Sequence, residues 1–385
     1  MINIGILLPR STLYPSLGLD ILNGLKSCLQ QLQLKEEFKL FTDNIGFGTD
    51  EAGIYAKAEK LLLQEDVDIA IVIADTRIQE MLQPLFAASN KLLLMVNFGA
   101  NLPESWQPAR TTIVHSLNFC LHARLTGQLA MAEGGKEAVN IVSYYDGGYH
   151  QCYSLLDSHQ QNGGVPFFTH ITHFKDSAFT LEPVNSFLAE QPAIKTALCL
   201  FTADMAAIFY KEIGSLQQQH GLKLYVSPMM LDETLKDFFT EPLSIQNTKG
   251  YSPWLSSLDN ENNRLFIETC AKAMGKQPNL FALLGWETGL LLQLYFEKQK
   301  EGAAGATAIV AKMKDAELQS PRGWLKLDAA TQHTYGPSWL LENNGSMELT
   351  IEAGVETIHE EWKKFTAKTL PKGESSSWRN TYLCI

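Results

Sequence analysis

Few side chains in this sequence stand at spacings that could support catalysis or metal binding. His170 and His173 form an HxxH pair, but no further cysteine, histidine or carboxylate follows them at metal-ligand spacing. Gly46, Gly48 and Gly53 give GxGxxxxG after the second predicted strand, rather than the GxGxxG of dinucleotide-binding folds. The GxSxG, HExxH and Walker A motifs are absent from the sequence. We therefore predict a protein that is not an enzyme and that needs neither a metal nor a cofactor.

Hydroxyl, amide and aromatic side chains gather instead in the loops that follow the predicted strands. Open α/β sheets bind ligands at the carboxyl ends of their strands, beside helix N-termini. A lining of this kind suits a small organic molecule that is bound without being transformed. The loops are Pro9–Leu17, Asp75–Gln79, Asn97–Asn101, Tyr145–Tyr149, Phe201–Asp204 and Ser227–Met230.

The elements that must position these loops follow an alternating strand and helix pattern. Ile69–Ile73 and Leu92–Val96 are apolar throughout, which is typical of parallel strands covered on both faces. Apolar residues at helical spacing after Ser16 and after Thr49, the two expected N-caps, predict covering helices. The fold class is therefore α/β, doubly wound. The predicted strands are 2–8, 38–42, 69–73, 92–96, 139–143, 196–201 and 222–226.

The strand and helix pattern runs twice along the chain. The first series ends near residue 115, and the second runs from about 139 to 226. A helix-rich stretch over 258–318 follows, and then two segments, 324–328 and 347–351, that resemble a pair of antiparallel strands. The residues from Lys372 onward are rich in Gly, Ser and Lys, and we expect them to be loosely held.

Composition excludes several classes of protein. The 385 residues suit two domains, and the excess of 42 acidic over 31 basic residues gives a net charge of −11. Such a charge disfavours binding to nucleic acid or to anionic lipid, and no apolar stretch is long enough for membrane insertion. The six scattered cysteines predict reduced, buried thiols. Residues 1–8 look like a strand rather than an export signal, so we expect a cytoplasmic protein or one whose signal is missing from this sequence.

The order of several motifs resembles that of a known family. The strand Ile4–Pro9 is followed by LGLDILNG at Leu17–Gly24, and later come Asn97–Asn101, Tyr145–Tyr149 and Gly323–Asp328. Together they resemble type I periplasmic binding proteins, and within them the leucine/isoleucine/valine-binding branch of ABC-transporter solute receptors. The likeness covers about residues 1–360.

This resemblance implies two Rossmann-like lobes that close on a ligand between them. One lobe would comprise 1–118 and 252–320, the other 119–249 and 325–360, with 361–385 as a C-terminal tail. The family implies a small-molecule ligand, an ABC permease as partner, and a location in the periplasm or cell envelope. The alternative is a cytoplasmic ligand sensor of the same fold that acts through a protein partner.

The resemblance also implies where the ligand is held. First-lobe hydroxyl and backbone N–H groups would hold a ligand carboxylate, and a second-lobe tyrosine would close over the ligand. The matching positions are Tyr14, Ser16, Thr76, Arg77, Asn97, Ala100, Asn101, Tyr149, Phe201, Thr202 and Met229.

The chain departs from the family at Met229. Amino-acid binders of this branch place an acidic residue there to hold the ligand ammonium, and a thioether cannot replace it. Asp75, Asp204 and Glu287 could substitute, but none of them matches by position. We therefore expect an apolar or aromatic ligand, with or without a carboxylate, and weak binding of leucine.

Overall fold

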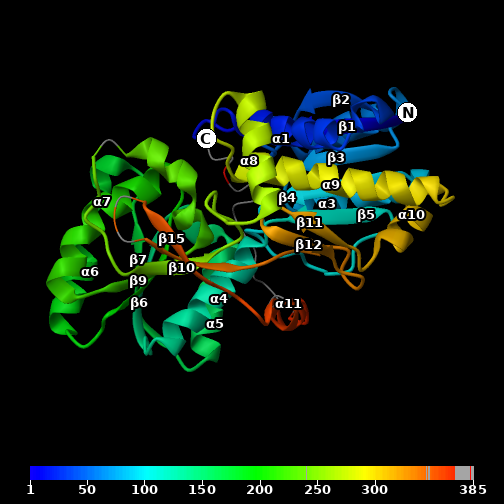
Figure 1. Ribbon diagram of the computed structural model, residues 1–385. Helices are drawn as coiled ribbons and strands as arrows, with labels where there is room; N and C mark the ends of the chain where they lie inside the picture. Colours follow the sequence, from blue (N-terminus) through cyan, green and yellow to red (C-terminus); the bar gives the residue numbers. More distant parts are fainter. Residues whose placement is uncertain (240, 344, 346, 369–381, 383–385) are drawn as a thin grey trace.

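Two sheets with helices packed against them form two lobes (Figure 1). The structure is a computed structural model that describes residues 1–239, 241–343, 345, 347–368 and 382. In Figure 1 the sheet near the N-terminus lies on one side of the molecule, and the sheet around β6–β10 lies on the other. Within the described residues, each helix is too short or too polar to cross a membrane.

The first sheet is parallel, with strand order β2-β1-β3-β4-β5. Its inner strands β3 and β4 are buried at every position, as their unbroken apolar sequences predict. The elements of this part are β1 Ile2–Leu8, α1 Leu17–Gln31, β2 Phe38–Asn44, α2 Glu51–Leu63, β3 Ile69–Ile73, α3 Thr76–Ser89, β4 Leu92–Asn97 and β5 Thr112–Ser116, with the 3-10 helix η1 Lys35–Glu37.

The second sheet has the order β15-β14-β10-β9-β8-β6-β7, with β14 and β15 antiparallel to their neighbours. Its first elements are α4 Phe119–Ala132, β6 Glu137–Ser143, η2 Asp146–Gly148, α5 His150–Gln161, β7 Val165–Thr172, η3 Asp176–Ala178, α6 Glu182–Glu190, β8 Thr196–Leu200 and α7 Ala203–His220. They are followed by β9 Lys223–Val226, η4 Pro228–Leu231, η5 Glu233–Phe238 and β10 Thr248–Ser252. The strands predicted before residue 116 and those predicted after residue 138 thus belong to different sheets.

The chain then returns to the first lobe through α8 Glu261–Met274, α9 Leu280–Lys300 and α10 Gly305–Met313. Helix α9 lies against α1 so closely that a Cβ atom on Gly24 would stand 2.0 Å from the carbonyl oxygen of Ala282. A Cβ atom on Gly285 would likewise stand 1.9 Å from the carbonyl oxygen of Ile21. Both glycines are therefore required by the close approach of the two helices, which fixes the N-terminal end of α9 beside the first sheet.

A small sheet, β11-β12-β13, lies between the helical return and the last part of the chain. The remaining elements are β11 Glu317–Ser320, β12 Gly323–Leu327, β13 Thr334–Tyr335, β14 Trp339–Asn343, β15 Leu349–Gly354 and α11 Ile358–Thr366. The expectation that 324–328 and 347–351 pair with each other is wrong, because β12 pairs with β11 and β13 whereas β15 pairs with β14. Both segments form strands, but in different sheets.

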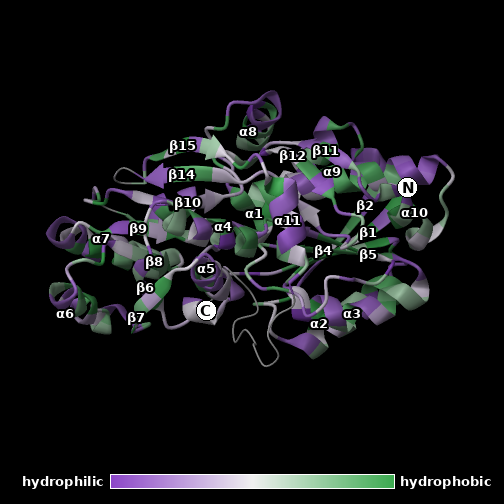
Figure 2. Ribbon diagram, turned by 90° about the horizontal axis from the view of Figure 1, so that it is seen from below, coloured by the Kyte–Doolittle hydropathy of each residue, from purple (hydrophilic) through white to green (hydrophobic). Residues whose placement is uncertain are grey.

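Figure 2 shows green, hydrophobic strands such as β4 and β5 inside the molecule, and more purple on outer helices such as α8. Two expected helix caps differ from the structure. Asp50 rather than Thr49 caps α2, and the side chain of Ser16 bonds to Asp20 instead of a backbone N–H group. The lobe boundaries stay a prediction, and α11 continues across the expected start of the tail at residue 361.

Candidate functional site

Aromatic side chains converge where the carboxyl ends of the first-sheet strands face the second lobe. Tyr14 lies in the loop after β1, and Phe98 directly follows β4. Phe281 stands in the first turn of α9, and Phe119 is the first residue of α4. These four side chains and Tyr382 are buried and belong to one apolar core. We call these five residues the aromatic cluster.

The ring of Tyr382 lies at the centre of the aromatic cluster. Its centroid is 4.8 Å from Phe98 and 5.2 Å from both Tyr14 and Phe281, with interplanar angles of 62–83°. The Phe119 ring lies farther away, at 6.2 Å. These are edge-to-face contacts, which add to the stabilisation that ring burial itself provides.

The second lobe contributes a carboxylate to the same place. Asp232 lies between η4 and η5, where its side chain accepts a hydrogen bond from the backbone N–H of Thr234. Its other oxygen accepts a hydrogen bond of 2.8 Å from the hydroxyl of Tyr382. Burial raises the pKa of Asp232, and these hydrogen bonds oppose the shift. The hydroxyls of Tyr14 and Thr234 lie near one another, yet neither makes a hydrogen bond of normal geometry within the described part of the chain.

A buried polar chain joins the two lobes beside the aromatic cluster. Asp75, the N-cap of α3, accepts a hydrogen bond of 3.0 Å from the amide of Asn101. The amide oxygen of Asn101 accepts in turn from the backbone N–H of His150, at the start of α5. Burial raises the pKa of Asp75 to about 7, against the opposing effect of its hydrogen bonds.

A second buried carboxylate, Asp146, lies in the other lobe. It accepts hydrogen bonds from the hydroxyl of Ser143 and from both the backbone N–H and the hydroxyl of Thr202. Burial raises its pKa to about 6. The site thus combines aromatic rings with three buried carboxyl groups, an arrangement that can hold a ring and accept hydrogen bonds from it.

Comparisons with known proteins show which family the chain belongs to. A family model described as periplasmic binding protein matches residues 1–346. The chain belongs to the periplasmic binding protein family. The resemblance noted in the sequence is therefore confirmed. Family members are binding proteins as a class. The comparison with curated proteins finds no match.

Solved structures share the fold of this periplasmic binding protein at low sequence identity. An ABC-transporter solute-binding protein from R. palustris, in complex with benzoate, is 21% identical, covers 92% of this chain and 96% of its own, and has a TM-score of 0.74. Another R. palustris solute-binding protein, in complex with 4-hydroxybenzoate, is 16% identical over 92% and 96%, with a TM-score of 0.73. A branched chain amino acid ABC transporter ligand-binding protein from Burkholderia xenovorans is 13% identical over 92% and 95%, with a TM-score of 0.74.

The residues expected in the first lobe of this periplasmic binding protein are dispersed. Tyr14 contacts the Tyr382 ring. Asn101 is buried beside Asp75, and the carbonyl of Ala100 accepts from the backbone N–H of Gln151. The Asn97 side chain accepts from the backbone N–H of Gly99 within its own loop.

Three other first-lobe residues have partners away from the ring of Tyr382. Thr76 begins α3 and donates its backbone N–H to Asp75. Arg77 is exposed and forms an ion pair of 2.6 Å with Glu51. The Ser16 hydroxyl donates to Asp20 and accepts from Lys276.

The residues expected in the second lobe also lie in different places, some near the aromatic cluster and some away from it. Tyr149 is buried at the N-terminus of α5. Burial is the main cause that raises the pKa of Tyr382, and the nearby Tyr149 adds to this shift. Met229 is buried in the same apolar core, and its sulfur accepts a hydrogen bond of 2.6 Å from the amide of Gln151. Phe201 instead packs into the separate core of the second lobe, stacked on Phe209 at 4.4 Å, and Thr202 holds Asp146.

Sequence reasoning missed Asp232, Phe98, Phe119, Phe281 and Tyr382. Asp232 stands three residues after Met229, so the second lobe supplies a carboxylate after β9 that we had not considered as a substitute for the acid missing at Met229. The absence of an ammonium site stays a prediction. The Asp-x-Thr capping pattern before η5 was the available signal. Tyr382 lies within the tail that we expected to be loosely held, yet it is only 2% exposed; the residues on either side of it lie outside the described part of the chain.

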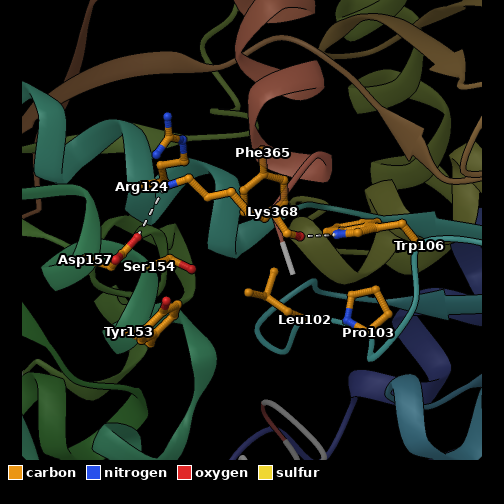
Figure 3. A pocket seen from close by; sticks show the side chains of 9 residues that line it. All are labelled: Leu102, Pro103, Trp106, Arg124, Tyr153, Ser154, Asp157, Phe365 and Lys368. Atoms are coloured by element: carbon orange, nitrogen blue, oxygen red, sulfur yellow. Dashed lines mark hydrogen bonds and ion pairs between the residues drawn. The ribbon is translucent and has the colours of Figure 1, made fainter. Parts of the chain in front are cut away.

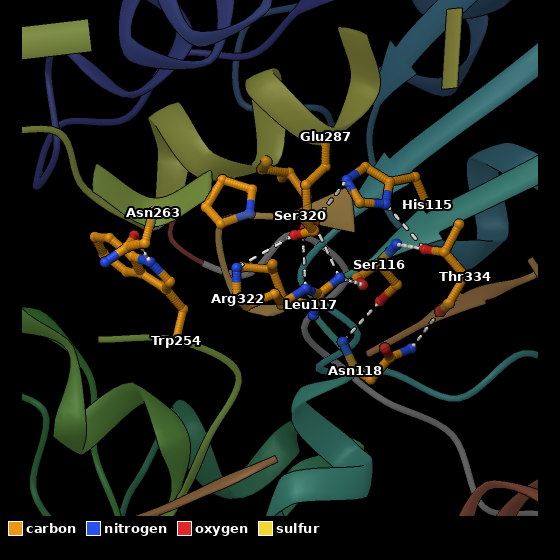
Figure 4. Close-up of polar contacts among 12 residues, drawn as sticks. His115, Ser116, Leu117, Asn118, Trp254, Asn263, Glu287, Ser320, Arg322 and Thr334 are labelled. Carbon is orange, nitrogen blue, oxygen red and sulfur yellow. Dashed lines mark hydrogen bonds and ion pairs between the residues drawn. The ribbon is translucent and has the colours of Figure 1, made fainter. Parts of the chain in front are cut away.

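Glu287 is held in a separate buried network (Figure 4). Both its carboxylate oxygens accept from the guanidinium of Arg322, at 2.8 and 2.9 Å, and one of them also accepts from Ser320. His115 approaches the same carboxylate, at 3.4 Å. Asp204 is exposed at the start of α7 and accepts from the backbone N–H of Met205. Glu287 is therefore already neutralised, and it is not available to a ligand ammonium.

A pocket lies outside the aromatic cluster, between the Leu102–Trp106 loop, α4, α5 and α11 (Figure 3). Arg124 and Phe365 line it, and Lys368 reaches across it to Asp157, at 3.4 Å. Its lining comes from the surface where α11 packs and from the later part of the loop after β4, and the five residues of the aromatic cluster are not among the lining residues. The described part of the chain contains no cluster of three His, Cys, Asp or Glu side chains arranged to hold a metal ion.

Proposed function

We propose that this protein binds a small aromatic solute carrying a hydrogen-bond donor in the cleft between its lobes. It hands the solute, unchanged, to an ABC permease at the cell envelope. The proposal is based on the surroundings of the Tyr382 ring. Aromatic side chains make edge-to-face contacts with this ring, and the carboxylate of Asp232 accepts a hydrogen bond from its hydroxyl.

The apolar lining supports an aromatic ring over an aliphatic side chain. Tyr14, Phe98 and Phe281 meet the central ring at steep angles, a geometry that a flat aromatic molecule reproduces and a branched aliphatic chain does not. Two of the structural neighbours were solved with benzoate and with 4-hydroxybenzoate. Those complexes are consistent with a pocket for a single aromatic ring in this fold.

The charges around the cleft argue for a neutral or cationic solute. Asp75, Asp146 and Asp232 are buried there, and an anionic solute would add a further negative charge to this group of acids. Three basic side chains are paired with acids: Arg77 with Glu51, Lys276 with Asp20, and Arg322 with Glu287. Arg10, in the loop after β1, is exposed and lies over the ring of Phe47. We therefore favour a phenol or an aromatic amine over the carboxylate that the family resemblance implied.

The proposal includes release without chemical change. The buried carboxyl groups of the site each accept hydrogen bonds from backbone or side-chain donors, and the cluster presents aromatic rings rather than a nucleophile with an adjacent base. Two of the structural neighbours are a solute-binding protein and a periplasmic ligand-binding protein of ABC transporters, which supports a role in transport.

Calorimetry with a matched pair of neutral ligands tests the proposal. We expect 4-hydroxybenzyl alcohol to bind at least about tenfold more tightly than benzyl alcohol, because a hydrogen bond to a charged group contributes roughly 1.5–3 kcal/mol. Leucine should bind more weakly than either compound. The titrations are made with the wild type and with the Tyr382→Ala variant, in which the resident ring is absent. Leucine binding more tightly than both alcohols in both proteins would overturn the proposal.

A further inference from the structure

The pocket in Figure 3 lies where three separate parts of the chain meet. One wall comes from the loop after β4 of the first sheet, another from α4 and α5, and the third from α11 and the residues that follow it. The pocket contains about 430 Å³ of empty space, part of which is open to solvent. A space of this size is within the range of pockets that take small molecules.

The walls of this pocket are largely apolar. Leu102 and Pro103 line it, and the rings of Trp106 and Phe365 meet edge to face with their centroids 5.4 Å apart. In Figure 3 the ring of Trp106 stands across the pocket from Ser154 on α5. A short hydrocarbon chain that enters this space is removed from water, which favours its binding.

Arg124, on α4, gives the pocket a positive charge that the protein neutralises only in part. The residue is 8% exposed, and its ion pair with Glu361 is long, with 3.5 Å between Nη2 and Oε2. The carboxylate of Glu361 already accepts hydrogen bonds from Lys364 and Gln128, at 2.7 and 3.1 Å. Within the described part of the chain, the buried Nε atom of Arg124 has no hydrogen-bond partner. A buried donor without a partner is unfavourable, so Arg124 can gain from an added acceptor.

The other charged residues of the lining are already paired. The Nζ atom of Lys368 is 3.4 Å from Asp157, whose two oxygens also accept from the amide of Gln161. Arg124 is therefore the charge that a ligand can complement, and a planar guanidinium pairs best with a planar carboxylate. Asp157 and Glu361 lie close by, and their charges disfavour a doubly charged anion such as phosphate.

We propose that this pocket is a second binding site, which takes a small monocarboxylate with a short apolar chain. The carboxylate pairs with Arg124, and the chain packs against Leu102, Pro103 and Phe365. The site is separate from the aromatic cluster, so the proposal does not depend on which solute the cleft binds. Because its walls include a loop of the first sheet and helices that pack on the second, a bound carboxylate favours the arrangement of the lobes in which these walls meet.

Calorimetry with butyrate, acetate, butyramide and inorganic phosphate tests the chemistry of the site. We expect butyrate to bind about tenfold more tightly than acetate, because two further methylene groups are buried. Butyramide has the same shape without the charge and should bind at least about tenfold more weakly than butyrate. Phosphate should also bind more weakly. Absence of butyrate binding, or an affinity no greater than that of the other three compounds, would overturn the proposal.

Substitution of two arginines tests where butyrate binds. Arg124→Gln should weaken the binding of butyrate at least about tenfold. Arg124→Lys should fall between this variant and the wild type, because lysine keeps the charge but lacks the planar fork of donors. Arg110→Gln is the matched control, since Arg110 is exposed and its loss removes the same charge without changing the pocket. Equal affinities of the wild type and Arg124→Gln would overturn the proposal.

Fluorine NMR of the wild type gives a readout that does not depend on the folding of an Arg124 variant. With 5-fluorotryptophan at every tryptophan, the signals of Trp106 and Trp254 are identified by their loss in the respective Trp→Phe variants. We expect butyrate to shift the Trp106 signal and to leave that of Trp254 unchanged, because Trp254 is buried beside Asn263, away from the lining. A Trp106 signal that does not respond to butyrate would overturn the proposal.

The same spectra show whether the two sites are separate. Saturating 4-hydroxybenzyl alcohol should leave the butyrate-induced shift of Trp106 in place, since we assign the alcohol to the cleft. Loss of this shift when the alcohol is added would mean that both compounds occupy one site, and it would overturn the proposal of a second site.

Discussion

The hydroxyl of Tyr382 donates a hydrogen bond of 2.8 Å to the carboxylate of Asp232, across the junction of the two lobes. Asp232 is 2% exposed, and its other oxygen accepts the backbone N–H of Thr234. Both oxygens of the Asp232 carboxylate therefore have a donor, one from the backbone of its own lobe and one from the hydroxyl of Tyr382. This relationship is the basis for our proposal that the protein binds a hydroxylated aromatic solute.

Replacing Asp232 by asparagine should remove the preference for a hydroxyl group. The amide keeps a hydrogen-bond acceptor but loses the charge, so affinity for 4-hydroxybenzyl alcohol should fall about tenfold, whereas affinity for benzyl alcohol should change little. Calorimetry in the Tyr382→Ala background measures both. Asp237→Asn is the control, because Asp237 is an exposed acid on η5, the 3-10 helix that Asp232 caps. An equal loss for both alcohols would indicate a structural role for Asp232 instead.

Asp75 should make stability depend on pH. Its pKa is raised from 3.8 to about 7, chiefly by burial, so the folded state favours the protonated form. This contribution to stability is fully present below about pH 4 and is lost as pH rises to 7, by up to about 4 kcal/mol. Urea unfolding of the wild type and of Asp75→Asn at pH 5 and pH 8 gives the unfolding free energy of each protein at each pH. The effect of Asp75 is the difference between the two proteins in how much this free energy changes from pH 5 to pH 8.

The other carboxyl groups provide controls for that experiment. Burial also raises the pKa of Asp146, to about 6, so the pH dependence of wild-type stability does not by itself isolate the contribution of Asp75. Asp43 pairs with Lys57, which lowers its pKa, so Asp43→Asn should alter the profile slightly and in the opposite sense. Parallel profiles for the wild type and Asp75→Asn would show that Asp75 titrates normally.

The ion pair of Glu287 and Arg322 should be essential for folding, unlike surface pairs. Both side chains are fully buried, so Arg322→Met leaves an uncompensated carboxylate and should cost about 3–5 kcal/mol of unfolding free energy. Lys298→Met is the matched control, since its pair with Glu301 is largely solvated and should contribute less than about 1 kcal/mol. Denaturant unfolding of both variants gives the comparison, and similar losses would contradict it.

Removing the ring of Tyr382 should open the lobes. Tyr382→Ala breaks contacts that join Phe98 and Asp232 across the junction, so the free variant should have a larger radius of gyration than the wild type. Addition of 4-methylphenol, which is the tyrosine side chain beyond the Cα atom, should restore the compact form. Small-angle scattering measures both states, with Tyr144→Ala as the control, since Tyr144 is 62% exposed. A variant as compact as the wild type without ligand would mean that other contacts keep the lobes together.

The fold was largely predictable from local sequence. The run Ile69–Ile73 had to be covered on both faces, and it forms the buried strand β3. Strand β7, Val165–Thr172, escaped prediction because it lies at the edge of its sheet and alternates exposed and covered positions. Strands β10 and β14 were missed too, since their pairing joins segments almost 100 residues apart.

The site was much less predictable. Tyr14 and Tyr149 were selected by their positions in the family pattern. Both lie near Tyr382, which comes from the other end of the chain and was not selected. Matching by family position selected Met229, whereas the geometry of η4 and η5 presents Asp232 instead. Contacts between residues this far apart follow from tertiary packing, which a single sequence does not display.

A crystal structure of Tyr382→Ala with 4-hydroxybenzyl alcohol tests the central claim most directly. The account predicts electron density for the aromatic ring between Tyr14, Phe98 and Phe281, with the phenol oxygen at hydrogen-bond distance from Asp232. Density only in the pocket lined by Trp106 and Arg124, or an empty interlobe site at saturating ligand, would contradict it.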